Sequence, residues 1–194
     1  MEFTYLSGQS PIDPDERAGL IPQHITTMGE LNDLEAANIA EAVIWLQTVR
    51  NPDPLSSEFL RTLHQKMLGQ VWRWAGQYRR SDKNIGGPWH EIPMRVEELL
   101  RDVKYQVKEK ALPPDEIAVR FHHKLVCIHP FPNGNGRHTR MAADILVTRV
   151  LGRPIFTWGA INLVSAGPFR DKYIAALVSA TAQDIKPLLD FVRS

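Results

Sequence analysis

The chain has 194 residues, which is long enough for one well-cored domain and short for two. Hydrophobic residues make up 43% and charged residues 23%, an ordinary composition for a soluble globular protein. The 23 lysines and arginines against 22 acidic residues give a net charge of +1, so we expect no nucleic-acid partner. No apolar run reaches membrane-spanning length, and we expect no membrane contact. Cys127 is the single cysteine, which excludes an internal disulfide and, with no signal-peptide pattern, favours a cytoplasmic location.

Proline and glycine dominate residues 1–25, and this predicts an irregular N-terminal arm. We expect one domain over the remaining residues, 26–194. Thr27 and Glu30 form a capping box, and the apolar spacing that follows predicts a helix over residues 27–50.

A second helix is expected after the Asn51-Pro52-Asp53-Pro54 break, because Ser56 or Ser57 can cap it. Its apolar stripe ends near Gly69. Beyond it the helical periodicity fails, and four large aromatic residues lie among glycines and a proline. This pattern predicts a loop with a short β-hairpin, which we place at residues 79–93.

The second half of the chain returns to helical spacing. A helix is predicted around residues 96–107, and another begins at the Pro113-Pro114 pair and leads to His129. A helix from about Asn135 to Leu151 is apolar on several sides, which is typical of a central helix. Two closing helices follow, so the predicted fold class is all-α with one small hairpin.

Residues 129–140 read His-Pro-Phe-Pro-Asn-Gly-Asn-Gly-Arg-His-Thr-Arg. Two glycines precede a helix N-terminus, where unpaired N–H groups and the helix dipole favour an anion. Arg137 and Arg140 share one face of the first turn and suggest a phosphate ligand. Asn133 offers an oxygen to a hard cation, and His129 is a base that titrates near neutrality. The combination predicts a phosphate-transfer site, with Phe131 as an apolar anchor for the loop.

This stretch resembles the signature of the Fic family, His-Pro-Phe-x-(Asp/Asn)-Gly-Asn-Gly-Arg-x-x-Arg, at every specified position. The resemblance is closest to a bacterial branch known as mobile mystery protein B. It implies a Fic-type helical bundle around a central helix-loop-helix motif. It also implies AMP transfer from ATP to a Ser, Thr or Tyr hydroxyl of a target protein, with pyrophosphate released.

The resemblance assigns a role to each motif residue. His129 is the general base, and Asn133, where the family more often has Asp, binds Mg²⁺. Arg137 and Arg140 hold the distal phosphates, and Arg137 separates the chain from the Doc-like variant that phosphorylates. The anion hole is formed by the glycine stretch Gly134, Asn135 and Gly136.

Two further assignments follow from the resemblance. The flap that holds the target is expected at residues 79–93, with Lys83, Asn84, Ile85 and Gly86 at its tip. Thr26 to Leu31 resembles the family's inhibitory motif, which would place Glu30 against Arg137; the alternative is that Glu30 only caps its helix. If the cap is its only role, a helix-turn-helix antitoxin-like partner, mobile mystery protein A, would supply inhibition.

Other possibilities stay open from the residues alone. A homodimer is an expected assembly. The donor could be another nucleotide or diphosphate, and the reaction could be phosphorylation. A catalytically silent nucleotide-binding module is the remaining alternative, although His129 argues against it because a pure binder needs no base.

Overall fold

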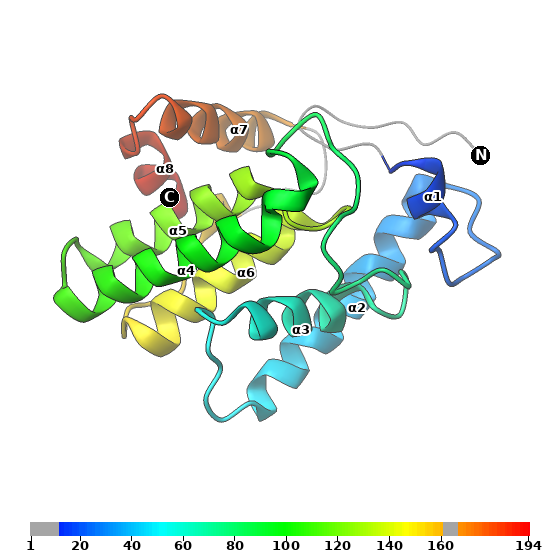
Figure 1. The fold of residues 1–194 in the computed structure, drawn as a ribbon, viewed down its shortest axis with the longest axis horizontal. Coiled ribbons are helices and arrows are strands. Elements are labelled where there is room, and N and C mark those ends of the chain that lie inside the picture. The colour runs from blue at the N-terminus through cyan, green and yellow to red at the C-terminus, as the bar shows by residue number, and fades with distance from the viewer. Residues whose placement is uncertain (1–11, 161–166) are drawn as a thin grey trace.

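The computed structural model describes residues 12–160 and 167–194, and in this part the chain is helical with no β-strand (Figure 1). The predicted all-α fold is confirmed. None of the helices in these residues is long and apolar enough to cross a membrane. The helices are α1 (Pro14–Arg17), α2 (Met28–Thr48), α3 (Ser57–Leu68), α4 (Ile92–Glu109), α5 (Pro114–Ile128), α6 (Asn135–Ile145), α7 (Pro168–Thr181) and α8 (Lys186–Val192), with short helical turns η1 (Trp89–Glu91), η2 (Leu146–Val150) and η3 (Trp158–Ala160).

Local side-chain bonds set the starts of α2 and α3. The Thr27 hydroxyl accepts the Glu30 amide at 3.2 Å, and the Glu30 carboxylate accepts the Thr27 amide at 3.0 Å, so the predicted capping box is present. At α3 the Ser56 hydroxyl accepts the Phe59 amide at 3.3 Å. Ser56, and not Ser57, is therefore the cap.

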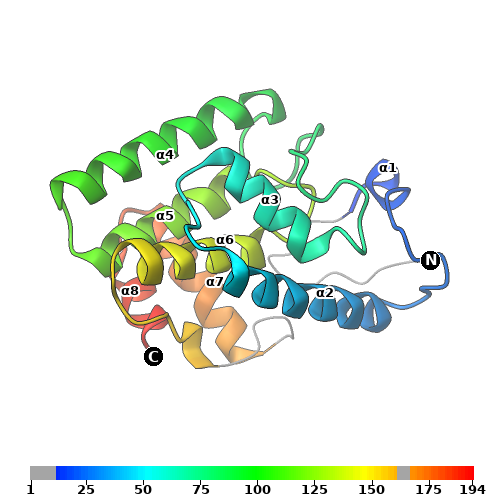
Figure 2. The same cartoon turned by 90° about the horizontal axis from the view of Figure 1, so that it is seen from below.

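Helices α5 and α6 form the centre of the bundle. Helix α4 packs on α5, α3 packs on α6, and α2 packs in turn on α3. Figure 2 shows α4 and α2 along opposite edges of the molecule, with α5 and α6 between them. Ala142 and Ala143 of α6 are fully buried, and their small side chains allow close packing. The loop that joins α5 to α6, residues 129–134, therefore lies at the heart of the fold.

The predicted β-hairpin at residues 79–93 is wrong. These residues form an irregular loop, and α4 already begins at Ile92. The reason is Arg79, whose buried guanidinium donates to the carbonyls of Ser81 at 2.7 Å and Gly87 at 2.6 Å. One side chain thus closes the loop in place of a strand ladder. We call residues 79–88 the flap loop.

The described part of the predicted arm, residues 12–25, packs against the flap loop. It is not irregular throughout, because Pro14–Arg17 form the helical turn α1. Asp13 and Glu16 both bind the Lys83 ammonium, at 2.8 Å and 2.5 Å. Residues 1–11 of the predicted arm lie outside the described residues.

The central helix changes its winding before it ends. Helix α6 stops at Ile145, and η2 continues it as one π-helical turn to Val150, where an uninterrupted helix to Leu151 was predicted. The Thr148 hydroxyl donates to the Asp144 carbonyl at 2.6 Å. Such back-bonding competes with the helical ladder and fits a local widening of the turn.

The C-terminal end is fastened by Arg193. Its guanidinium donates to both carboxylate oxygens of Asp115 at 2.8 Å and to the carbonyls of Pro154 and Ile155 at 2.9 Å. It also lies 4.4 Å from the centre of the Phe156 ring. Arg193 hydrogen-bonding holds the pKa of Asp115 below its usual range.

We predict that Arg193→Met lowers the free energy of unfolding by about 1–2 kcal/mol, because partly exposed charged hydrogen bonds are lost while the apolar stem is kept. Lys186→Met is the control, since the Lys186 ammonium is exposed and pairs with the exposed Asp190. Urea unfolding at pH 7 and at lower pH measures both. Since the pKa of Asp115 is depressed on folding, the difference between wild type and Arg193→Met should shrink below about pH 4. A difference that persists at pH 2.5 would contradict the ion pair.

Candidate active site

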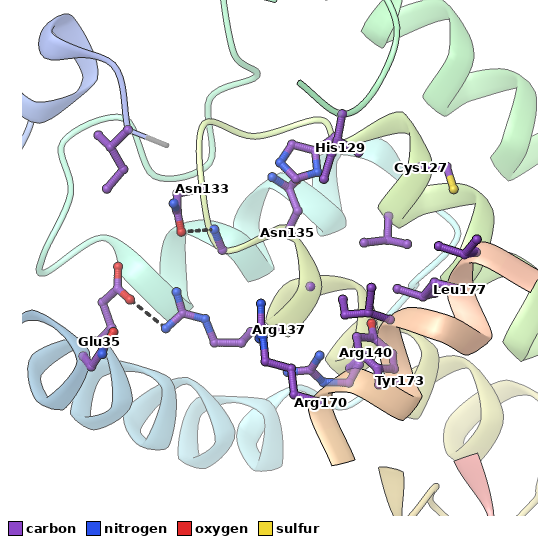
Figure 3. Close-up of a pocket in the computed structure, with 18 of the residues that line it drawn as sticks. Glu35, Cys127, His129, Asn133, Asn135, Arg137, Arg140, Arg170, Tyr173 and Leu177 are labelled. Atoms are coloured by element: carbon purple, nitrogen blue, oxygen red, sulfur yellow. Dashed lines mark hydrogen bonds and ion pairs between the residues drawn. The ribbon is translucent and has the colours of Figure 1, made fainter. Parts of the chain in front are cut away.

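A cavity of about 360 Å³ opens where the motif loop, α2, α6 and α7 meet (Figure 3). All the predicted catalytic and phosphate-binding residues of the motif line it, together with Asn133. Its other walls are mostly apolar. The apolar lining comes from Ile12, Met28, Leu31, Ile85, Val126, Ile174, Leu177 and Val178.

His129 ends α5 with a left-handed backbone, φ 54°. Non-glycine residues rarely adopt this conformation, and it persists where the surroundings impose it. Arg79 imposes it here, because its Nε donates to the His129 carbonyl at 2.8 Å and its backbone N–H donates to the Pro130 carbonyl at 2.9 Å. Burial, followed by the nearby Arg79 guanidinium, lowers the pKa of His129 to about 4. The imidazole is therefore neutral at pH 7 and can accept a proton.

Phe131 anchors the motif loop to the core. Its side chain is fully buried and stacks on His64 with ring centres 3.8 Å apart. The buried Asn135 side chain closes the loop over it, accepting the Phe131 amide at 3.0 Å and donating to the Phe131 carbonyl at 2.7 Å. The Asn135 side chain thus holds the loop, and its backbone amide is left to face an anion.

Gly134 caps α6 in the left-handed region, with φ 75°. A Cβ there would lie 2.5 Å from Leu68 Cδ1, so the buried Leu68 side chain would have to move, and the positive φ itself favours glycine. In the described part of the chain the amides of Asn135, Gly136 and Arg137 have no acceptor, as expected for a first helical turn. The Gly134 amide is different, since it donates to Asn133 Oδ1 at 2.6 Å.

Glu35, and not Glu30, is the carboxylate that meets the motif. Its Oε2 lies 2.7 Å from a terminal nitrogen of Arg137, and its Oε1 accepts the Trp72 indole N–H at 2.7 Å (Figure 3). Glu30 Oε2 instead accepts the Thr26 amide and hydroxyl and the Thr27 amide at the start of α2. Of the two roles considered for Glu30, the structure shows the helix cap and no contact with Arg137, whereas Glu35 lies against Trp72 and lines the cavity.

Arg170 and Tyr173 of α7 also line the cavity. Neither was identified as a site residue from the sequence. Arg170 lines the cavity near Arg140, and the Arg140 guanidinium carbon lies 5.3 Å from the centre of the Tyr173 ring. Tyr173 is buried and its hydroxyl lies 2.9 Å from His122 Nε2. Only the packing of α7 against the motif reveals them, since neither lies in a recognisable pattern.

The four residues at the expected flap tip have different positions. Ile85 lines the cavity, and Gly86 packs so closely that a Cβ would lie 2.9 Å from the Ile128 carbonyl oxygen. Asn84 is exposed. Lys83 turns away to bind Asp13 and Glu16. The flap loop therefore faces the site with Ile85 and Gly86.

A divalent cation would find few protein ligands here. No group of three His, Cys, Asp or Glu side chains that could hold a metal occurs in residues 12–160 and 167–194. Asn133 lines the cavity and carries an amide oxygen beside the anion-binding amides. One neutral oxygen fits Mg²⁺, which commonly takes few protein ligands and completes its shell with phosphate and water.

Comparison with known proteins finds similarity to the Fic/DOC family in sequence and in fold. The sequence profile of the Fic/DOC family matches residues 54–147. The protein adenylyltransferase Fic of Aedes aegypti is 27% identical over 170 residues, which cover 86% of this chain and 32% of that protein. The corresponding protein of Drosophila melanogaster is 28% identical with similar coverage. The chain thus spans about a third of the length of the curated relatives it matches.

Solved structures share the fold at lower identity. The N-terminal Fic domain of a Bartonella quintana effector with bound ADP has a TM-score of 0.68 at 18% identity, covering 88% of this chain and 86% of that one. The BepC protein of Bartonella tribocorum with bound AMPPNP has a TM-score of 0.72 at 16% identity, covering 93% and 97%. Residues 54–147 of this chain therefore match the Fic/DOC family in sequence, and the chain shares the fold of these Fic structures.

Proposed function

We propose that this protein transfers AMP from ATP to a Ser, Thr or Tyr hydroxyl of a target protein and releases pyrophosphate. The observation that carries the proposal is the neutral, buried His129 beside a glycine-capped helix N-terminus and two arginines in one cavity. The curated relatives are named protein adenylyltransferases, and similar domains hold ADP or AMPPNP.

His129 supplies the proton acceptor. As the target hydroxyl oxygen forms a bond to the α-phosphorus, its proton passes to the imidazole. The bond between the α-phosphorus and the bridging oxygen breaks, and pyrophosphate leaves. The left-handed backbone and the Arg79 contact hold the imidazole in place during this step.

The anion is held by backbone and side chains together. The amides of Asn135 and Gly136 and the dipole of α6 face the phosphates, and Arg137 and Arg140 neutralise their charge. Mg²⁺, when bound, adds charge neutralisation at the phosphates, with Asn133 as the protein ligand.

The flap loop is proposed to hold the target segment. Ile85 and Gly86 make no backbone hydrogen bond in the described residues, so their N–H and C=O groups can pair with an extended peptide. Recognition of this kind uses backbone groups more than side chains. It places the target beside the cavity that Ile85 lines.

The test of the reaction uses ATP labelled at either end, incubated with the protein and cell lysate. Label from the α-phosphate on protein establishes AMP transfer. Label from the γ-phosphate alone establishes phosphorylation and refutes the proposal. His129→Ala is the control, and we expect it to lower the labelling rate by about 10²–10⁴-fold.

The pH dependence tests His129 separately. Because the pKa is lowered to about 4, the imidazole stays neutral and active at all higher pH values, and activity is lost only as pH falls through that value. We therefore predict constant kcat/KM between about pH 8 and pH 5.5, whereas a histidine of ordinary pKa would lose half its activity near pH 6.5. Initial rates, with circular dichroism at each pH to monitor folding, make the measurement. Half-loss near pH 6.5 would contradict the assignment.

We also propose that Glu35 restrains the enzyme in cis. Its carboxylate occupies a guanidinium nitrogen of Arg137 that a distal phosphate would otherwise engage. The pair is largely buried, with 20% of the Arg137 side chain and 4% of the Glu35 side chain exposed, so water screens it little. Release would need a rearrangement of α2, which holds Glu35 over the site. A helix-turn-helix partner is the alternative source of inhibition.

We predict that Glu35→Gln raises ATP affinity and target labelling about tenfold or more, since a charge-assisted contact is worth about 1.5–3 kcal/mol. Glutamine keeps an acceptor for the Trp72 indole, which preserves the packing of α2. Glu30→Gly is the matched control, and it should destabilise the start of α2 without raising activity. Calorimetry and matched labelling assays measure both. Equal activity of wild type and Glu35→Gln would assign inhibition to a partner chain.

A further inference from the structure

His64 of α3 lies outside the motif, yet its Nε2 and its ring face contact the motif loop. It is fully buried. Its Nδ1 accepts the Gly76 amide at 2.9 Å, and its Nε2 lies 3.0 Å from the Asn133 carbonyl oxygen. The ring face stacks on Phe131.

The two hydrogen bonds define one tautomer. A backbone N–H can only donate, so Nδ1 must be the unprotonated nitrogen. Nε2 then carries the hydrogen and donates to the Asn133 carbonyl. Burial lowers the pKa of His64 well below its ordinary value, which is consistent with this single neutral form. The two hydrogen bonds therefore hold the ring in one orientation between Gly76 and Asn133.

His64 holds a carbonyl of the loop that neither Arg79 nor Asn135 binds. Arg79 holds the carbonyls of His129 and Pro130, and Asn135 holds that of Phe131. In the described residues, His64 is the side chain that holds the carbonyl of Asn133. The next residue, Gly134, turns into the left-handed region and starts α6.

We propose that His64 is a positioning residue, which orients Asn133 for the divalent cation and aligns the anion-binding amides after Gly134. The proposal rests on the function proposed above. It also links the Gly76 turn, which leads into the flap loop, to the metal-binding residue through one imidazole. The competing explanation is that His64 only fills the core under Phe131.

Two uncharged substitutions separate these explanations. In His64→Gln the amide NH₂ lies near the position of Nε2 and can still donate to the Asn133 carbonyl, while the bond to Gly76 is lost. In His64→Asn the amide oxygen lies near Nδ1 and can still accept from Gly76, while the bond to Asn133 is lost. Both variants lose the stacking on Phe131. His138→Gln is a control for changing a buried histidine, because its Nε2 bonds the Leu60 carbonyl instead.

The first readout is amide hydrogen exchange in the ligand-free protein at Gly134 and His138, whose amides donate to Asn133 Oδ1 and to the Gly134 carbonyl. We expect exchange in His64→Asn to be about tenfold or more faster than in wild type, and exchange in His64→Gln and His138→Gln to stay near wild type. The second readout is the Mg²⁺ concentration that half-saturates the enhancement of ATP binding, measured by calorimetry. We expect it to rise about tenfold in His64→Asn only, the usual size of an effect on a ligand-orienting residue.

Each outcome decides. Equal behaviour of His64→Asn and His64→Gln, with losses that follow their melting temperatures, overturns the proposal, and so does a larger loss in His64→Gln. If wild type shows no Mg²⁺ dependence of ATP binding, the proposed cation site fails, while hydrogen exchange still decides whether His64 holds the loop. If His64→Asn does not fold, His64→Phe replaces it, since it keeps the stacked ring and loses both bonds.

Discussion

The buried guanidinium of Arg79 is the contact on which the site depends. Its side chain is fully buried, and it binds the carbonyls of His129, Ser81 and Gly87. A buried charge is costly unless its donors are satisfied, and carbonyl oxygens from two segments satisfy this one. The same cation closes the flap loop, fixes the backbone of His129 and adds to the effect of burial in lowering the pKa of His129. Loop position and base strength are thus coupled through one residue.

A second theme is that the motif loop is held by side chains, not by a regular ladder. Arg79, Asn135 and His64 each hold a carbonyl of residues 129–133. Buried carbonyls need such partners, because an unmade hydrogen bond costs more than a made one contributes. The loop can therefore hold an unusual shape, with left-handed residues at both His129 and Gly134. That shape turns the first amides of α6 towards the cavity.

The cavity carries an excess of positive charge. Arg137, Arg140 and Arg170 line it, while Glu35 supplies the carboxylate against Arg137. Asn133 brings an oxygen without a charge, and at present that oxygen accepts the Gly134 amide. A cation at Asn133 would compete with this bond and leave the Gly134 amide to an anion. Metal binding and phosphate binding would then support each other, as linked equilibria do.

The sequence by itself determined the helical class, the cap at Thr27 and the motif residues that line the cavity, and it narrowed the cap of α3 to Ser56 or Ser57, because these depend on neighbours within a few positions. Tertiary structure decided what depends on distant partners. The flap loop lacks the predicted hairpin because Arg79 satisfies its carbonyls, and no local pattern shows where a guanidinium will point. Glu35, five residues beyond Glu30, pairs with Arg137. The packing of α2 on α3 determines which face of α2 is turned towards the site. Helical periodicity identifies the faces of a helix, but only its packing decides which side chain each face brings to the chemistry.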